Sequence, residues 1–306
     1  MLAYVVRRLA QAAVTMLGVT LMVFLSLHIA PGDPAVLIAG DEASQEDLQR
    51  IRVYYGLDKP LPVQYLRWAW GVLHGNFGTS HRGGAPVGPD LLAAFKITLL
   101  LSLGALALAI AIGMPVGLIA GIKRDGPFDL AVMGLSILGM SMPVFWVALL
   151  MVLAFSLRLG WLPSAGWGTF KHFVMPCLAL SLTSLALIAR MTRATMVEVL
   201  LEDYVRTARA KGLAQFVLLL KHALPNALPP VVTIIGLRFG LLVGGAVITE
   251  TVFAVPGVGR LVIQGVSQRD FPVVQSGVLV IALLVGIISL LVDLSLSVMD
   301  PRIRYA

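Results

Sequence analysis

Apolar residues in this chain gather into six runs that short polar segments separate. The runs cover residues 9–30, 98–122, 130–155, 174–189, 229–249 and 273–299. A helix needs roughly 20 mostly apolar residues to cross the hydrocarbon core of a bilayer, and all but the fourth run reach that length. The pattern therefore predicts an all-α polytopic membrane protein with about six transmembrane helices.

The composition also indicates a lipid environment. Hydrophobic residues make up 58% of the 306 residues and charged residues 13%, whereas soluble proteins carry about 25% charged residues. Cys177 is the only cysteine, so the chain has neither an internal disulfide nor a metal site built from cysteines. The net charge of +7 would suggest nucleic acid in a soluble protein. In a membrane protein the placement of the charges matters more, and we expect no nucleic-acid partner.

The lysines and arginines of the short loops indicate the orientation. Those expected on one side are Arg7, Arg8, Lys123, Arg124, Arg190, Arg193, Arg206, Arg209, Lys211, Lys221, Arg302 and Arg304. Those in the opposite short loops are Arg158, Lys171, Arg260 and Arg269. Because positive residues concentrate on the cytoplasmic side, we expect both termini in the cytoplasm. The first apolar run is too long for a signal peptide and lacks an A-x-A-like cleavage site, so it predicts an uncleaved anchor.

These patterns divide the chain into four parts. Residues 1–30 form the cytoplasmic start and the first span, residues 31–94 an outer helical segment, residues 95–299 the membrane core, and residues 300–306 a cytoplasmic tail. Within the core, residues 197–226 form the longest cytoplasmic loop.

The outer segment reads as a small helical cap. Pro31 to Pro34 predict a turn after the first span. Ser44 and Asp47 resemble a capping box, and Gly56 is suited to the end of that helix. Pro62 can begin a second helix, whose tryptophans, Trp68 and Trp70, lie either at the membrane interface or within the cap. Residues 75–89 are rich in glycine and proline and predict a loop.

Two spans carry small residues at every fourth position. The first ladder is Ala105, Ala109, Gly113, Gly117 and Gly121, and the second is Gly236, Gly240 and Gly244. On a helix each ladder forms a groove that another backbone can approach closely. The ladders serve simple bundle packing or, alternatively, tight and movable contacts around a pathway.

Sequence motifs for catalysis are absent. No lysine follows glycine and precedes serine or threonine, so the chain has no P-loop for nucleotide phosphates. It also lacks an H-E-x-x-H zinc helix and a G-x-S-x-G nucleophile elbow, and its five histidines are scattered. We therefore expect a non-catalytic chain without a cofactor or metal of its own.

The cytoplasmic loop has an unusual pattern. One helical stripe holds Val197, Leu201, Tyr204, Val205 and Ala208. Glu202 and Arg206, away from it, stand at a favourable i,i+4 spacing. Gly212 interrupts this helix, and a second apolar helix is expected from about Ala214 to Leu224 and Pro225. Such an elbow is either a basic hairpin on anionic lipid or a docking surface for a cytoplasmic partner.

The loop resembles the signature of permease subunits of bacterial ABC importers. That signature is Glu-Ala-Ala, three residues, Gly, nine residues, Ile, one residue and Leu-Pro. Ala208, Gly212, Leu224 and Pro225 match it. Arg206, Thr207 and His222 depart from it, but the form DYVRTARAKGL is typical of the peptide and nickel branch of that family.

The resemblance continues along nearly the whole chain. The segments that carry it are, in order, PGDP, GLDKPLPVQY, GNFGTS, SMPVFW, TETVFAVPGVGRL, RDFPVVQ and DPRIRY. Each segment is weak evidence by itself, but their shared order is specific.

The resemblance implies a type I ABC importer permease fold in the bacterial inner membrane. It implies a second, homologous permease subunit, two ATPase subunits that use ATP and Mg, and a periplasmic solute-binding protein. Implied solutes are dipeptides, longer peptides or glutathione, with nickel complexes or opines as the alternative. The short outer loop at residues 157–173 resembles members that handle small peptides or glutathione.

The candidate functional residues fall into two groups. The resemblance implies that the elbow couples the chain to an ATPase, through Tyr204, Arg206, Thr207, Ala208, Arg209, Lys211, Gly212, Leu213, Leu224 and Pro225. For a translocation pathway or gate the candidates are Met142, Pro143, Trp146, Arg238 and Glu250. Arg238 is a charge within a span, so we expect it to face the bundle interior or water rather than lipid. Glu250 precedes a segment bent by proline and glycine.

Other classes of function use the same residues differently. A secondary transporter or channel would couple ions through Arg238, Glu250 or Asp293, but the sequence has no clear inverted repeat. A membrane scaffold would use the small-residue ladders for packing alone. An intramembrane enzyme would need catalytic motifs that the sequence lacks.

The predicted orientation can be tested by cysteine labelling. A cysteine at Ser44 should react with a membrane-impermeant thiol reagent added to intact cells, whereas a cysteine at Lys211 should react only after the cytoplasmic side is exposed. The parent chain, which carries only Cys177, is the control. The opposite labelling pattern would overturn the topology.

Overall fold

The computed structural model describes residues 2–29, 35–36, 43–81 and 84–299. Over these residues the chain is helical, and its β structure is limited to one isolated bridge between Thr79 and Pro86. The turn expected at Pro31 to Pro34, the segment DPRIRY and the side chain of Asp293 lie outside the described residues.

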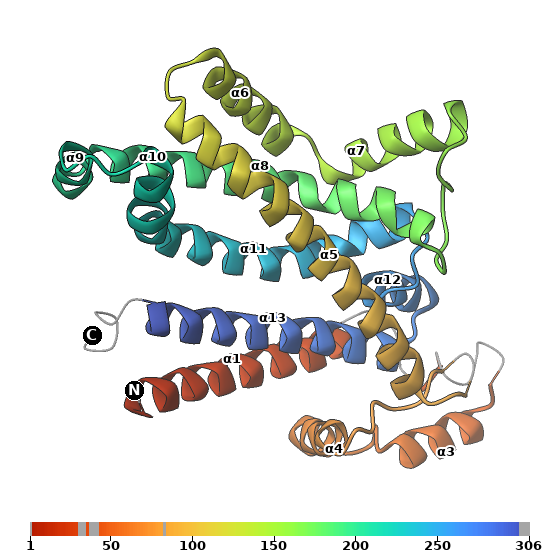
Figure 1. Cartoon of the computed structure of the whole chain (residues 1–306). Coiled ribbons are helices and arrows are strands. Elements are labelled where there is room, and N and C mark those ends of the chain that lie inside the picture. The colour runs from red at the N-terminus through yellow and green to blue at the C-terminus, as the bar shows by residue number, and fades with distance from the viewer. Residues whose placement is uncertain (1, 30–34, 37–42, 82–83, 300–306) are drawn as a thin grey trace.

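The helices follow one another with short connections (Figure 1). They are α1 (Leu2–Ile29), α3 (Gln45–Tyr55), α4 (Leu61–Leu73), α5 (Val87–Ile122), α6 (Pro127–Ser141), α7 (Val144–Met151), the π-helix η1 (Val152–Arg158), α8 (Phe170–Leu201), α9 (Asp203–Ala210), α10 (Gln215–Val217), the π-helix η2 (Leu218–Ala223), α11 (Leu224–Val252), α12 (Val258–Gln268) and α13 (Phe271–Met299).

Within the described residues, five helical stretches are long and apolar enough to cross a membrane. They are Val6–Leu25, Val87–Ile122, Phe170–Leu201, Gln215–Val252 and Phe271–Val292. Pro127–Ser141 and Val144–Arg158 together meet the same test as a pair bent by 101°. The prediction of about six spans in an all-α membrane protein is confirmed.

The predicted bounds of the second, third and fourth spans are wrong. The second span starts at Val87 rather than at residue 98, and the fourth extends over Phe170–Leu201 rather than residues 174–189. The third is not one helix, because it breaks between Ser141 and Val144. Proline lacks a backbone N–H and disfavours helical geometry in the residue before it. Met142, which precedes Pro143, accordingly has an extended backbone with ψ of 125°.

The outer segment has the predicted local structure. The Ser44 hydroxyl accepts a hydrogen bond from the backbone N–H of Asp47 at 3.2 Å. It also donates one to the Asp47 carboxylate at 2.6 Å, which lowers the pKa of that carboxyl. Gly56 ends α3 with φ of 70°. Trp68 packs on Phe24 of α1 at 6.2 Å between ring centroids, whereas Trp70 stays mostly exposed and contacts His74. The cap therefore rests on the first span through some of its aromatic residues only.

The core of the bundle is the crossing of α5 and α8. A Cβ atom at Gly117 would lie 2.3 Å from the carbonyl oxygen of Ala189, and one at Gly113 would lie 2.8 Å from that of Leu185. These backbones therefore touch where glycine omits a side chain, as the ladder predicts. In the second ladder, Gly236 lies against Val292 of α13, whereas Gly244 has no neighbouring atom within 4 Å of such a Cβ.

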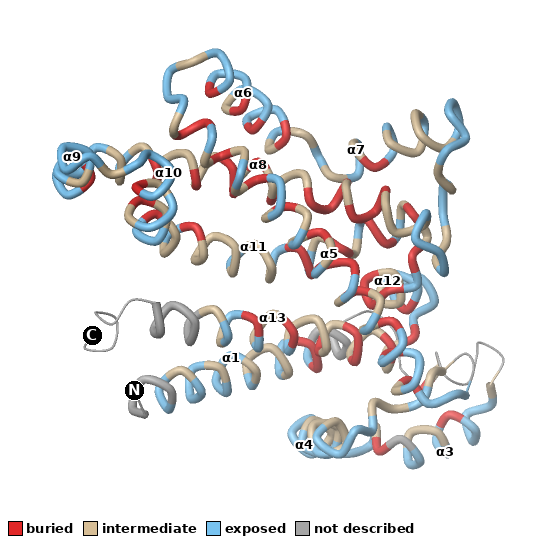
Figure 2. Tube along the Cα trace, in the orientation of Figure 1, coloured by how far each residue is buried: buried red, intermediate tan, exposed pale blue. Residues whose placement is uncertain are grey.

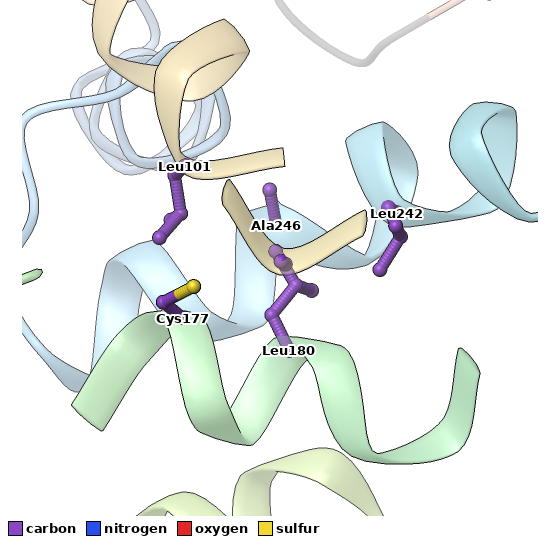
Figure 3. Close-up of a cluster of buried hydrophobic side chains, with 6 residues drawn as sticks. Leu101, Cys177, Leu180, Leu242 and Ala246 are labelled. Atoms are coloured by element: carbon purple, nitrogen blue, oxygen red, sulfur yellow. The ribbon is translucent and has the colours of Figure 1, made fainter. Parts of the chain in front are cut away.

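A third helix completes this core. Figure 3 shows Leu101 of α5, Cys177 and Leu180 of α8, and Leu242 and Ala246 of α11 directed toward one another. Buried residues concentrate along α5 and α8, whereas α1 and α4 are largely exposed (Figure 2). The helices α5, α8 and α11 thus form the rigid centre to which the other elements attach.

An ion pair fixes α6 to α8. The Asp129 carboxylate in the first turn of α6 accepts hydrogen bonds from Nε and Nη2 of Arg193 at 3.0 and 2.6 Å, and another from the N–H of Asp125 at 2.9 Å. Such two-pronged charged pairs are short and geometrically specific. The Asp129 carboxylate therefore holds both the turn between α5 and α6, through Asp125, and α8, through Arg193.

Two groups of helices lie at opposite ends of the molecule. The start of α1, the last turns of α13, and α9 with α10 lie at one end of the molecule, whereas α3, α4 and α12 lie at the other (Figure 1). This arrangement agrees with an even number of membrane crossings.

Gly117→Ala and Gly244→Ala form a matched pair for the packing of α5 on α8. We expect Gly117→Ala to destabilise the protein by about 1–3 kcal/mol, since the added methyl meets a backbone oxygen. Gly244→Ala should be neutral or stabilise by up to about 1 kcal/mol, because alanine favours helix. Thermal unfolding in detergent measures both. Equal effects of the two variants would contradict close packing at Gly117.

Candidate functional site

The elbow at the end of α8 is built from two short helices. α8 ends at Leu201, Glu202 is extended with ψ of 147°, and α9 then runs only from Asp203 to Ala210. The predicted helical stripe from Val197 to Ala208 is therefore wrong, because it spans this break. The predicted Glu202–Arg206 pair is wrong too. Glu202 caps α9 through its backbone, and the guanidinium of Arg206 lies 3.7 Å from the carboxylate of Asp203.

Gly212 ends α9 in the left-handed conformation expected for it. Its φ is 78°, its N–H donates to the carbonyl oxygen of Arg209 at 3.0 Å, and the N–H of Leu213 donates to that of Ala208 at 3.3 Å. A side chain at this φ is strained even though open space surrounds the position. Gly212 therefore permits the chain to reverse between α9 and α10.

The second arm of the elbow does not stop at Pro225. It continues from α10 through η2 into α11 as one span, Gln215–Val252, so the predicted end at Leu224 and Pro225 is wrong. Pro225 lies in the first turn of α11. The π-helical η2 interrupts the α-helical register directly before it. The elbow is consequently joined to a membrane span without a flexible linker.

The elbow exposes basic residues on and just after α9 and the apolar side chains of Phe216 and Val217 on α10. Val205 and Leu218 are buried and anchor it, and Leu224 packs in the cluster of Met196, Ala223 and Ala227. Ala208 and Leu213 are half-buried. The other predicted coupling residues are exposed, namely Tyr204, Arg206, Thr207, Arg209, Lys211, Gly212 and Pro225. The predicted coupling residues thus divide into an exposed set and a half-buried set, the latter being Ala208, Leu213 and Leu224.

Tyr204 also links α9 to α11. Partial burial raises the pKa of the Tyr204 phenol, and a hydrogen bond with the side chain of Asn226 opposes that rise. Asn226 was not among the predicted residues. Only the fold brings its side chain to Tyr204, 22 positions earlier in the chain.

The pathway candidates Met142, Pro143 and Trp146 lie where the third span breaks. Together with Leu138, Ser141 and Phe145 they line an open groove of about 330 Å³. Non-helical backbone at membrane depth is tolerated only where protein buries it or water reaches it. The break therefore requires a wet pathway or a second protein at this surface.

Glu250 lies at the opposite end of the molecule from the elbow and is fully buried. Its carboxylate accepts a hydrogen bond from the hydroxyl of Thr98 in α5 at 2.6 Å and another from the backbone N–H of Arg260 in α12 at 3.1 Å. The Thr98 oxygen in turn accepts from the N–H of Val258 at 2.9 Å. Negative charge stabilises a helix N-terminus. Glu250 therefore caps the first turn of α12, although it belongs to α11.

The segment between Glu250 and α12 is closely fitted to that carboxylate. A Cβ atom at Gly257 would lie 2.1 Å from an oxygen of Glu250. Ala254 has φ of 52°, and its carbonyl oxygen accepts a hydrogen bond from Arg260. Thr98 was not predicted, because one threonine in an apolar run carries no signal of a distant partner.

Two outer segments named in the sequence analysis meet in space. The Ser80 hydroxyl donates to Asp270 at 2.5 Å, the N–H of His81 donates to Asp270 at 3.3 Å, and the Ser276 hydroxyl donates to the carbonyl oxygen of Phe77 at 3.0 Å. Burial lowers the pKa of His81, and the charge of Asp270 opposes this. The segment GNFGTS is thereby fastened to the start of α13.

Arg238 lies near the middle of α11 and is half-buried.

Among the described residues no group of three or more His, Cys, Asp or Glu side chains could hold a metal ion.

Two family models match the chain. One, described as "Binding-protein-dependent transport system inner membrane component", matches residues 113–305. The other, described as the N-terminal part of the membrane component of binding-protein-dependent transport systems, matches residues 1–95.

Curated relatives match over the full length. A putative peptide transport system permease protein of Brucella abortus (strain 2308) is 44% identical, and the match covers 100% of both chains. The dipeptide transport system permease protein DppB of Escherichia coli (strain K12) is 40% identical over 100% of this chain and 99% of its own.

The fold resembles that of a solved transporter. The structure described as an inward-facing conformation of the MetNI methionine ABC transporter superposes with a TM-score of 0.59. The match has 21% sequence identity and covers 69% of this chain and 96% of the other.

Loss of the Glu250 carboxylate should loosen α12. We expect Glu250→Ala and Thr98→Val to destabilise the protein by about 1–3 kcal/mol each, since buried hydrogen-bonding groups lose partners. Hydrogen exchange measured by mass spectrometry should become faster at Val258 and Arg260. Thr251→Ala is the control, because this exposed hydroxyl donates to the carbonyl oxygen of Val247 within its own helix. Unchanged exchange in α12 would show that Glu250 does not hold it.

Proposed function

Because the chain belongs to the family of binding-protein-dependent transport system inner membrane components, we propose that it is the permease subunit of an ATP-driven importer of short peptides. It forms one wall of the pathway, and partner ATPases supply the energy. A second permease subunit completes the pathway, and a periplasmic binding protein delivers the solute. The relatives named as peptide and dipeptide permeases support the substrate class.

The observation that carries the proposal is the elbow formed by α9 and α10. It presents an exposed basic surface, is anchored by buried Val205 and Leu218, and continues into the span that contains Arg238 and Glu250. In this proposal a cytoplasmic ATPase engages that surface. Its motion passes along α11, and along α8 through the cluster around Met196, to the pathway.

The proposed orientation places the elbow and both termini in the cytoplasm and α12 outside, across a bacterial inner membrane. The basic residues of the short loops support this orientation. So does the position of the start of α1 and the last turns of α13 at the same end as α9.

A secondary transporter fits these features less well. Ion coupling requires an ionisable group that can exchange its ion. The carboxylate of Glu250 is instead enclosed by Thr98, Gly257 and α12. No relative named above is described as a nickel or opine permease, so peptides remain the proposed substrate.

Gly212→Val tests the elbow, with Gly160→Val as its matched control. Both glycines have positive φ, 78° and 63°, and open space where a Cβ would lie. Both variants should therefore cost about 1–2 kcal/mol in backbone strain. Only Gly212→Val should impair the coupling of ATP hydrolysis to uptake, since Gly160 lies in the outer loop before α8.

The measurement is made with the complete transporter in proteoliposomes. Peptide uptake and ATP hydrolysis are recorded in parallel for both variants, and co-purification with the ATPases is checked. We expect Gly212→Val to lower uptake per ATP by about fivefold or more, the range of a coupling free energy. Full coupled transport in Gly212→Val, or an equal loss in Gly160→Val, would refute the docking role.

A further inference from the structure

A crevice with a polar wall lies between the first and the last span. α1 and α13 pack side by side (Figure 1), and the crevice between them has a volume of about 160 Å³. α1 contributes the side chains of Arg8, Gln11 and Thr15 to its wall, and α13 contributes Ser289. Polar side chains of two spans thus meet in a groove that is separate from the elbow and from the break at Met142.

The crevice is closed at one end by a contact between the two helices. A Cβ atom at Gly286 of α13 would lie 2.5 Å from the terminal methyl group of Met16, so the helices touch there. Arg8 lies about two turns before Met16 on α1, and Leu290 lies one turn after Gly286 on α13. The crevice therefore extends about 12 Å along α1, at 1.5 Å per residue, toward the end of the bundle that holds the start of this helix.

That end of the crevice is positively charged. Arg7 and Arg8 both lie near the start of α1, where Arg7 is exposed and Arg8 is half-buried in the crevice wall. In the proposed orientation this end faces the cytoplasm, and the cytoplasmic leaflet carries anionic lipids. Basic pockets between spans on this side of a membrane bind anionic headgroups.

The polar side chains supply donors suited to a phosphate group. The guanidinium of Arg8 is planar and matches phosphate with parallel N–H donors. Its Nη1 donates to Oε1 of Gln11 at 3.4 Å, which leaves the NH₂ group of that amide as a donor. Ser289 adds a hydroxyl from α13. The hydroxyl of Thr15 adds no donor, because it already donates to the carbonyl oxygen of Gln11 at 2.9 Å.

Exposed apolar side chains flank the crevice. On α1, Leu9, Val14 and Leu17 are at least half exposed, and so are Ile287 and Leu291 on α13. Acyl chains can lie along these surfaces while a headgroup occupies the basic end. A soluble anion would make the polar contacts alone, so the combination favours a molecule with a charged head and apolar tails.

We propose that this crevice binds the headgroup of an anionic phospholipid of the cytoplasmic leaflet, with its phosphate held by Arg8, Gln11 and Ser289. The inference rests on the orientation in the proposed function, but not on the solute or on the ATPases. The bound lipid links α1 to α13 beyond their contact at Gly286, and so holds the first span against the bundle.

The first test maps where the lipid lies and needs no transport assay. The complete transporter is reconstituted in phosphatidylcholine vesicles that contain a small fraction of phosphatidylglycerol with a photoreactive diazirine in its headgroup. After illumination, adducts are located by mass spectrometry of peptides. They should gather on residues 8–16 and 286–290. An excess of unlabelled phosphatidylglycerol should remove these adducts, whereas added inorganic phosphate should leave them.

Two neighbouring arginines form a matched pair for this measurement. Arg8→Gln should lower the adduct yield at the crevice by about fivefold, the contribution of one basic residue near an anionic surface. Arg7→Gln removes the same charge one residue away, but Arg7 is exposed and lies outside the described lining of the crevice. Its effect should therefore be clearly smaller. Equal losses in the two variants would indicate a general attraction of this end for lipid and would overturn a specific site.

A second pair of variants fills the crevice without changing its charge. Ala12 lines the crevice, whereas Ala13 beside it is exposed. Ala12→Leu should exclude the headgroup and lower the adduct yield as far as Arg8→Gln does. Ala13→Leu should leave the yield unchanged, because its side chain meets the surroundings of α1. An unchanged yield in Ala12→Leu would contradict binding inside the crevice.

Other occupants give different results. Removal of the adducts by inorganic phosphate identifies a soluble anion and overturns the proposal. A lack of adducts at the crevice in the complete transporter, together with their presence on the isolated chain, identifies the second permease subunit as the occupant and also overturns it. If the adducts and their dependence on Arg8 are found but the complex imports no peptide, the lipid site stands and the proposed transport function fails.

Discussion

The backbones of α5 and α8 touch where glycine replaces a side chain, and the other elements are positioned by that crossing. The hydrophobic effect contributes little to helix association in a membrane, because lipid tails are themselves apolar. Close packing must therefore supply the attraction between helices. Gly113 and Gly117 allow it by bringing α5 against carbonyl oxygens of α8. On this base Leu242 and Ala246 attach α11, and the bond between Arg193 and Asp129 attaches α6.

The second constraint is that backbone polar groups need partners in a membrane. This requirement favours irregular backbone at the ends of the bundle rather than inside a span. The elbow at Gly212 and the segment before α12 lie at opposite ends of the bundle (Figure 1). The break at Met142 and Pro143 is the exception, since it lies inside a span. That exception marks the surface where water or another subunit must approach.

The span that begins at Gln215 connects these features. It starts in the elbow, passes Arg238 and ends at Glu250, whose carboxylate holds both Thr98 of α5 and the first turn of α12. A force applied at the elbow therefore reaches α12 through one continuous helix. In the proposed function, this is how an event on a cytoplasmic ATPase would alter the outer end of the pathway.

The sequence by itself determined the class of the protein, the number of spans, the small-residue packing of α5 and the left-handed turn at Gly212. These follow from composition and local geometry, which need no knowledge of distant contacts. The break at Met142 follows locally from Pro143. Tertiary structure decided where other spans end, since the break at Glu202 and the continuation past Pro225 depend on neighbouring helices. It also decided that Glu250 meets Thr98 and that Arg193 meets Asp129. Such pairs join residues on separate helices, and periodicity within one helix holds no information about the rotation and depth of another.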